Sequence, residues 1–218
     1  MHSWSRFTDM IKYILILLLP LPWLACTASP RSTSRVQPAY DAKTGRLTEL
    51  TYDDNHNGRI DTWVHMNGTR ILRAESDHDE DGRIDRWEYY RAVGSLEKVG
   101  VSRLDDGVVD AWAFEDAKGK ISRIEISTRR DGRVDRIEFF TDGILDHVEE
   151  DTNRDGRSDK WETYRDAALT VVAFDTRGRG TPDRRLVYRV DGTLDHLEVD
   201  EDGDGTFKAV KHHDVNSQ

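Results

Sequence analysis

The feature that most constrains the fold is an internal repeat of 24 or 25 residues. Seven glycines recur at this interval: Gly58, Gly82, Gly107, Gly132, Gly156, Gly180 and Gly205. Aspartate follows six of them by three positions, and tryptophan follows four of them by five positions, at Trp63, Trp87, Trp112 and Trp161. A unit this short cannot bury a hydrophobic face alone, so neighbouring units must stack. We therefore expect a linear repeat domain over residues 39–211.

Each unit is predicted to be a β-hairpin. A second glycine lies midway in most units: Gly45, Gly68, Gly94, Gly119, Gly143 and Gly192. Between the turns, side chains alternate with period two, as in the run 85–90, and no stretch has sustained helical spacing. The predicted fold class is all-β: an elongated, coiled antiparallel meander of about 24–25-residue β-hairpin repeats, with a dozen strands or more. A propeller of separate blades is the alternative.

The composition favours a thin sheet over a thick globular core. Hydrophobic residues make up 36% of the chain and charged residues 34%, and the mean hydropathy is -0.74. We expect the Trp, Tyr and Phe side chains to form the core layer, although a row of exposed aromatics could instead bind sugars or peptidoglycan. Leu96, Val99 and Val101 break strict alternation, which indicates a β-bulge in a second strand.

Acidic residues gather in the loop that precedes the first strand of most units. We number these nine-residue loops 1 to 7: 53–61, 77–85, 102–110, 127–135, 151–159, 175–183 and 200–208. Loop 2 has carboxylates at positions 1, 3, 5 and 9 and glycine at position 6. Alternating carboxylates repel one another unless a cation lies among them, and Ca²⁺ takes six to eight oxygen ligands. The loops are thus predicted to bind calcium, with a metal-free Asx turn as the alternative.

Loop 2 resembles an EF-hand calcium loop. The resemblance implies as ligands Asp77, Asp79, Asp81, the carbonyl of Arg83, Asp85 and Glu88. Strands rather than helices are predicted to follow, and an extended strand carries position 12 about 10 Å from position 9. Position 9 is therefore favoured as the distal ligand, as in the similar D-x-D-x-D-G-x-x-D loops of integrin-type and thrombospondin type 3 repeats. The alternative for the position-12 glutamates is a cross-strand pair with Arg or Lys.

The other loops keep this ligand set to different extents. In loop 5 the predicted ligands are Asp151, Asn153, Asp155, Asp159 and Glu162. In loop 1 they are Asp53, Asn55, Asn57 and Asp61. In loop 7 they are Asp200, Asp202 and Asp204. Loop 7 ends in Lys208, and loops 3, 4 and 6 lose ligands. In loops 4 and 6 we expect arginine to replace the metal and pair with nearby carboxylates. The opening unit, from Tyr40 to Asp53, resembles the YD-type hairpin repeats of large bacterial surface and toxin proteins, which form coiled β-strips.

The N-terminus is predicted to be a targeting signal rather than part of the folded domain. Residues 1–25 are interpreted as a lipoprotein signal peptide, since the apolar run is shorter than the roughly 20 residues that span a bilayer. Leu24-Ala25-Cys26 resembles the lipobox of bacterial lipoproteins, although Trp23 stands where that motif has an aliphatic residue. The resemblance implies lipidation of Cys26, and Thr27 after it implies the outer membrane; ordinary secretion or a retained membrane anchor is the alternative. Residues 26–38 are predicted to be a flexible tether, and residues 212–218 a disordered tail.

The net charge and the sequence motifs argue against some classes of function. A net charge of -10 argues against nucleic acid as a partner. No motif for nucleophilic, metal-hydrolytic or phosphate chemistry occurs in the sequence, so a role other than catalysis is expected. We therefore expect a calcium-binding, membrane-anchored exported lipoprotein that acts as a structural module of the cell envelope. The alternative is an adhesin, or a repeat protein that binds a protein or an envelope polysaccharide, in which the metal only stiffens the scaffold.

Overall fold

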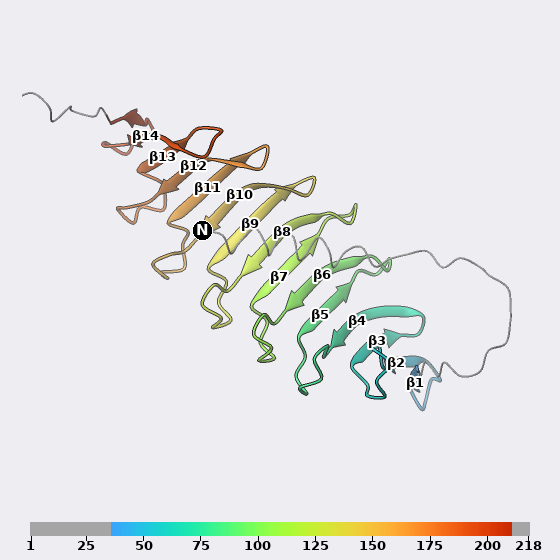
Figure 1. The fold of residues 1–218 in the computed structure, drawn as a ribbon. Helices are drawn as coiled ribbons and strands as arrows, with labels where there is room; N and C mark the ends of the chain where they lie inside the picture. The colour runs from blue at the N-terminus through green and yellow to red at the C-terminus, as the bar shows by residue number, and fades with distance from the viewer. Residues whose placement is uncertain (1–35, 211–218) are drawn as a thin grey trace, which may run out of the picture. The chain divides into compact units, whose positions relative to one another are not determined.

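The computed structural model describes residues 36–210. The predicted signal peptide, Cys26, most of the predicted tether and the tail 212–218 lie outside the described residues. The described residues form one sheet of fifteen strands, in which each strand pairs with the next strand in the sequence (Figure 1). The predicted all-β antiparallel meander is therefore confirmed. The strands belong to one continuous sheet rather than to the separate blades of a propeller.

The strands are short and regularly spaced. They are β1 (Gln37–Tyr40), β2 (Leu47–Tyr52), β3 (Thr62–Asn67), β4 (Arg70–Ser76), β5 (Arg86–Tyr90), β6 (Leu96–Val101), β7 (Ala111–Glu115), β8 (Ile121–Ile126), β9 (Arg136–Thr141), β10 (Ile144–Glu150), β11 (Lys160–Arg165), β12 (Ala168–Phe174), β13 (Arg184–Tyr188), β14 (Leu194–Val199) and β15 (Lys208–Ala209). Residues 36–210 contain no helix that could cross a membrane.

The two kinds of turn lie on opposite edges of the sheet. Short turns close the hairpins β1–β2 to β13–β14, and loops 1 to 7 connect each hairpin to the next strand. Because strands alternate in direction, all seven loops project from the same edge (Figure 1). Successive loops are two strand spacings apart, or roughly 9.5 Å. Side chains of consecutive loops can therefore reach one another.

Every hairpin contains a shift of register near its short turn. In β5–β6, Tyr89 pairs with Lys98 and Tyr90 pairs with Leu96, so that Glu97 is an extra residue in the second strand. The other six hairpins have equivalent shifts. The expected β-bulge is thus found, and it recurs in all seven hairpins. Each bulge increases the right-handed twist of the sheet.

The buried core differs from the expected aromatic layer. The four tryptophans share one face of the sheet and are only half-buried. The most deeply buried large side chains, Ile124, Ile126 and Val148, lie on the opposite face and are at most 1% exposed. Val148 pairs with Glu138 on one side and Glu162 on the other. On one face, short aliphatic side chains are covered by their longer neighbours, so this row is buried without a second layer. On the other face, the large indole rings extend beyond their neighbours and stay partly exposed.

Candidate metal sites in the acidic loops

Loops 1 to 6 end in an aspartate at position 9, and Lys208 takes this place in loop 7. The aspartate carboxylate accepts a hydrogen bond from the backbone N–H of position 2 in five loops; in loop 2, Asp85 accepts from His78 at 2.6 Å. The equivalent bonds are made by Asp61, Asp110, Asp135 and Asp159, at 2.8 to 3.0 Å. Asp110 and Asp183 are each 3% exposed although their loops lack most of the other acidic residues. Position 9 therefore has a structural role that explains its recurrence without a metal.

The side chains at positions 3 and 5 form Asx turns, and the side chain at position 1 accepts a hydrogen bond from the backbone of position 6. In loop 2, Asp77 accepts from the N–H of Gly82 at 2.9 Å, Asp79 accepts from Asp81 at 3.1 Å, and Asp81 accepts from Arg83 at 2.8 Å. Loop 5 has the same pattern, with Asp151, Asn153 and Asp155 as acceptors. Each of these bonds uses one side-chain oxygen. In loop 2, reversal of the chain thus uses one oxygen at each position and leaves the second carboxylate oxygen available for a ligand. In loop 5, both oxygens of Asp151 accept backbone N–H groups, and Asn153 has a single side-chain oxygen.

Loop 2 contains one carboxylate oxygen that the turn does not explain. Asp77 is 6% exposed, and its Oδ1 is buried without a hydrogen-bond partner among the described residues. Asp77, Asp79 and Asp85 each place one oxygen within 4.8 Å of the others. A buried carboxylate oxygen without a donor is unfavourable, and a cation held by these oxygens would relieve the cost. The residues of loop 2 therefore fit a metal ion.

The other loops that were predicted to bind calcium match a metal site to different degrees. In loop 7, Asp200, Asp202 and Asp204 also bring oxygens within 4.8 Å of one another, and Asp200 is 3% exposed. Both carboxylate oxygens of Asp200 accept backbone N–H groups, from Gly203 at 2.8 Å and Gly205 at 3.0 Å.

In loop 1, donors already occupy much of the predicted ligand set. The carboxylate of Asp53 accepts from the N–H groups of Asn57 and Gly58. The side-chain amides of Asn55 and Asn57 donate to Glu80 of loop 2. In loop 5, Asp159 accepts from both the N–H and the hydroxyl of Thr152. Among residues 36–210, groups of three or more acidic side chains close enough for a metal are found in loops 2 and 7 and between loops 2 and 3.

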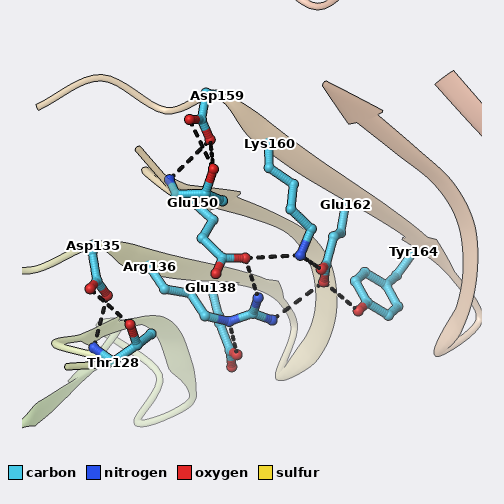
Figure 2. Close-up of polar contacts among 10 residues, drawn as sticks. Thr128, Asp135, Arg136, Glu138, Glu150, Asp159, Lys160, Glu162 and Tyr164 are labelled. Carbon is cyan, nitrogen blue, oxygen red and sulfur yellow. Dashed lines mark hydrogen bonds and ion pairs between the residues drawn. The ribbon is translucent and has the colours of Figure 1, made fainter. Parts of the chain in front are cut away.

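The two glutamates predicted as candidates at position 12 lie away from their loops. Glu88 pairs with Arg86 at 2.7 Å and accepts a hydrogen bond from the hydroxyl of Tyr90. Glu162 pairs with Lys160 at 2.7 Å and with Arg136 at 3.3 Å (Figure 2). The structure therefore places both carboxylates in ion pairs on the sheet. The pair of Glu162 with Arg136 joins two strands, as in the cross-strand alternative, whereas Glu88 pairs with Arg86 within β5.

Arg136 is the centre of a partly buried ion-pair network on the sheet face that carries the aliphatic core. Its guanidinium contacts Glu138 at 3.0 Å, Glu150 at 3.2 Å and Glu162 at 3.3 Å (Figure 2). Burial by itself raises the pKa of Glu162, but the hydrogen bond from Lys160 and the charge of Arg136 outweigh it and hold that pKa below its ordinary value. Three strands, β9 to β11, are thereby joined through charged side chains.

Position 4 of each loop has a backbone conformation that is shared by all seven loops. Its φ lies between 60° and 79° at His56, Glu80, Asp105, Arg130, Arg154, Gly178 and Gly203. In several loops the side chain at this position contacts the preceding loop. Glu80 accepts from Asn55 of loop 1 at 2.6 Å, and Arg154 donates to Asp131 of loop 4 at 2.7 Å. Position 4 is therefore a contact point between consecutive loops.

Sequence reasoning missed one acidic residue, Asp105, at position 4 of loop 3. Asp79, Asp81 and Asp105 bring carboxylate oxygens within 4.8 Å of one another across the two loops. The side-chain contact with Asp79, together with burial and nearby carboxylates, raises the pKa of Asp105 to about 6. The same contact lowers the pKa of Asp79. Loop 3 was expected to have lost its metal because Ser102 and Leu104 replace acidic residues, and only the spacing to the preceding loop could have revealed Asp105.

Arginines in loops 4 and 6 reach the following loop. Arg129 donates to the carbonyl of Thr152 at 3.4 Å, and Arg177 donates to the carbonyl of Glu201 at 2.9 Å. Arg177 also lies 3.7 Å from Asp183 of its own loop. The expected pairing with carboxylates is found for Arg177, whereas Arg129 contacts a backbone carbonyl. These loops are thus linked to the next loop by guanidinium groups.

Comparison with known proteins leaves the chain without an assigned family. No family model matches it, and no curated protein matches it. A solved S. aureus TarM mutant in complex with Fondaparinux, alpha-GlcNAc-glycerol and UDP is 8% identical, covers 58% of this chain and 23% of its own, and has a TM-score of 0.38. A structure of accessory secretory protein 1, 2 and 3 in Streptococcus pneumoniae is 17% identical and covers 60% of this chain and 21% of its own, with a TM-score of 0.28.

A porin-like protein from Bacteroides uniformis covers more of both chains. It is 11% identical, covers 79% of this chain and 86% of its own, and has a TM-score of 0.26. This chain spans less than a quarter of the length of the first two structures. Likenesses this weak carry no argument about function, which is therefore inferred from the loops themselves.

Proposed function

We propose that this protein is a calcium-binding repeat protein of the bacterial cell envelope, anchored through a lipid on Cys26. Its role is structural rather than catalytic: Ca²⁺ bound in the acidic loops stiffens one edge of the hairpin sheet. Loop 2 is the principal site and loop 7 the second, because each brings three carboxylate oxygens within 4.8 Å of one another. Loops 1 and 5 are weaker sites, because their described residues form no such group.

The observation that carries the proposal is the unpaired Oδ1 of Asp77. It is buried and has no hydrogen-bond partner among residues 36–210. Unlike the buried oxygens of Asp110 and Asp183 that also lack such a partner, it belongs to a residue whose carboxylate lies in one group with those of Asp79 and Asp85. Asp77 and Asp79 use one oxygen each for the turn, so a second oxygen of each remains for a ligand. Retaining this arrangement without a cation would cost free energy that an ordinary Asx turn does not incur.

The donor set favours calcium over transition metals. Asp77, Asp79 and Asp85 supply only carboxylate oxygens, which suit hard cations, whereas zinc sites use mainly Cys and His. His78 is the histidine in loop 2, and its ring contacts Asp85 at 2.9 Å. Solvent-exposed loops of this kind are expected to bind calcium in the weak range of extracellular modules, with Kd of about 10⁻⁴–10⁻³ M. Calcium at extracellular concentration would then occupy them.

Calcium titration of the detergent-solubilised protein tests this proposal. We expect stoichiometric uptake of Ca²⁺ by calorimetry and a higher midpoint of thermal unfolding in calcium than in EGTA. Mg²⁺ at the same concentration serves as the control, because it requires a smaller octahedral site that a flexible loop does not provide. Absence of binding heat together with an unchanged midpoint would contradict the proposal.

A second candidate function, partner binding, is favoured by the aromatic face of the sheet. Lys98 Nζ lies 4.1 Å from the ring centre of Trp112 and 4.9 Å from that of Tyr89, and Arg123 lies 4.2 Å from Phe114. These aromatic side chains are half-buried, so parts of their rings face solvent. Such a surface could bind an envelope polysaccharide. Quenching of tryptophan fluorescence by purified envelope polysaccharide, lost in a Trp112→Leu variant, would support it.

A further inference from the structure

The contacts between consecutive loops differ in chemistry at one junction. Between loops 1 and 2, the carboxylate of Glu80 meets the side-chain amides of Asn55 and Asn57 and lies 3.3 Å from the guanidinium of Arg59. The acceptor at position 4 of loop 2 is therefore matched by donors at positions 3, 5 and 7 of loop 1. Between loops 4 and 5, the pairing is also complementary, with Arg154 on Asp131.

Between loops 2 and 3, the residues at positions 3 and 5 of loop 2 and at position 4 of loop 3 are all acidic. Asp105 at position 4 of loop 3 faces Asp79 and Asp81, at positions 3 and 5 of loop 2, with oxygens within 4.8 Å of one another. Arg83, at position 7 of loop 2, is the nearby cation; its Nε lies 3.9 Å from Asp81, its aliphatic part packs beside Gly107, and its side chain is 59% exposed. The guanidinium of Arg83 thus lies at the edge of the group rather than among the three carboxylates.

Two buried carboxylate oxygens at this junction have no hydrogen-bond donor within residues 36–210 and could bind a cation. Oδ1 of Asp105 and Oδ1 of Asp77 are both buried, and neither has a hydrogen-bond partner in the described part of the chain. Asp79 belongs to both acidic groups, with Asp77 and Asp85 on one side and with Asp81 and Asp105 on the other. The two groups therefore form one cluster of five carboxylates that spans two hairpins.

We propose that Asp105 of loop 3 is a ligand of the divalent cation bound by loop 2, so that one ion ties two consecutive hairpins together. This inference rests on the proposed function, since it takes loop 2 as the calcium site. It adds a ligand from a loop whose own set is incomplete. Calcium would then hold loop 2 against loop 3, in the place that amide and guanidinium donors occupy between loops 1 and 2 and that a guanidinium occupies between loops 4 and 5.

The test compares three variants of the full protein with the wild type, in calcium and in EGTA. Asp105→Asn removes the proposed ligand charge, and Asn tolerates the φ of 62° at this position. Asp77→Asn removes the central ligand of loop 2 and keeps an acceptor for the N–H of Gly82. Asp106→Asn is the matched control, because it removes the same charge from the same loop, where Asp106 contacts Ser102 and Val108 instead of the cluster.

We expect opposite effects of Asp105→Asn in the two conditions. In EGTA its unfolding midpoint should rise above that of the wild type, because a carboxylate facing two others is removed. In calcium, the affinity of one site should fall about tenfold or more, as expected when a charged ligand is lost. Amide exchange in loop 3 should be slowed by calcium in the wild type but not in this variant. Asp106→Asn should bind calcium as the wild type does.

The outcomes separate this inference from the proposed function. Wild-type calcium affinity in Asp105→Asn, with affinity lost in Asp77→Asn, would overturn the shared ligand and leave loop 2 as a calcium site. Equal weakening by Asp105→Asn and Asp106→Asn would also overturn it, because the effect would then reflect net charge alone. If the wild type takes up no calcium, both the proposed function and the inference fail.

Discussion

The indole ring of Trp112 lies directly over the backbone of Gly100. A Cβ atom at position 100 would lie 2.7 Å from Cζ3 and 2.9 Å from Cη2 of this ring. Gly100 pairs across the sheet with Trp87 on one side and Trp112 on the other, and it is buried. A glycine inside a strand weakens the strand unless another group approaches closely, and here the indole does so.

Replacing this glycine is predicted to destabilise the sheet. Gly100→Ala should lower the free energy of unfolding by roughly 1–3 kcal/mol, the usual cost of overpacking, as measured by urea denaturation. In a Trp112→Leu background, the same substitution should cost much less, because the ring that collides with the new methyl group is gone. Equal costs in both backgrounds would show that the contact is not the cause.

The Arg136 network gives a second prediction. Arg136→Met should destabilise the protein by about 3 kcal/mol or more, because it leaves glutamates without their shared partner in a partly buried site. The side chain of Arg136 is 13% exposed and that of Glu138 is 7% exposed. Arg73→Met is the matched control: Arg73 also pairs with a glutamate, but its side chain is 41% exposed, so the cost should be within about 1 kcal/mol. Similar losses in the two variants would argue against a special role of the network.

The lowered pKa of Glu162 predicts how stability depends on pH. A carboxyl group whose pKa is lower in the folded than in the unfolded protein stabilises the fold above its ordinary pKa of 4.5, and the contribution disappears as the pH falls through the folded value. Glu162→Gln should therefore be less stable than the wild type at pH 7, and the difference should shrink below about pH 4.5. Denaturation of both proteins between pH 3 and 7 measures this difference; a constant difference would contradict the assignment.

A substitution in the turn between β11 and β12 is predicted to raise the free energy of unfolding. Asp166 and Ala167 have φ values of 51° and 63°, and the equivalent turn between β9 and β10 has Asp142 followed by Gly143. Ala167→Gly removes the left-handed strain of roughly 1–2 kcal/mol and adds unfolded-state entropy worth about 0.4–1 kcal/mol. A net gain of up to about 1 kcal/mol is expected in chemical denaturation. Ala113→Gly, within β7, should instead destabilise.

Calcium should stabilise the protein through loop 2 and not through loop 6. With Kd of 10⁻⁴–10⁻³ M and 1 mM calcium, one site contributes roughly 0.4–1.4 kcal/mol. Asp77→Asn should remove this calcium-dependent part. Asp175→Asn changes position 1 of loop 6, whose carboxylate accepts from the N–H of Gly180 at 2.6 Å in a loop that also carries Arg177. Its calcium-dependent gain should equal that of the wild type, and a loss there would mean that the ligand assignment is wrong.

The repeat by itself determined the fold class, the strand meander and the position of the acidic loops. The period of 24 or 25 residues leaves room for two short strands and two turns, and alternating side chains fix which residues share a face. Leu96, Val99 and Val101 were enough to predict a bulge in one hairpin. The sequence pattern also identified Asp77, Asp79, Asp81 and Asp85 as candidate oxygen ligands.

The tertiary structure decided what lies between units. Which face buries the core depends on cross-strand neighbours, so Val148 between two glutamates is covered while Trp112 is half-exposed. The use of Glu162 in an ion pair with Arg136 depends on register between β9, β10 and β11, which places residues 26 positions apart within 3.3 Å. Asp105 joins the cluster of loop 2 only because consecutive loops project from the same edge of the sheet. Contacts of this kind arise from strand pairing, and a reading of each repeat in isolation cannot reveal them.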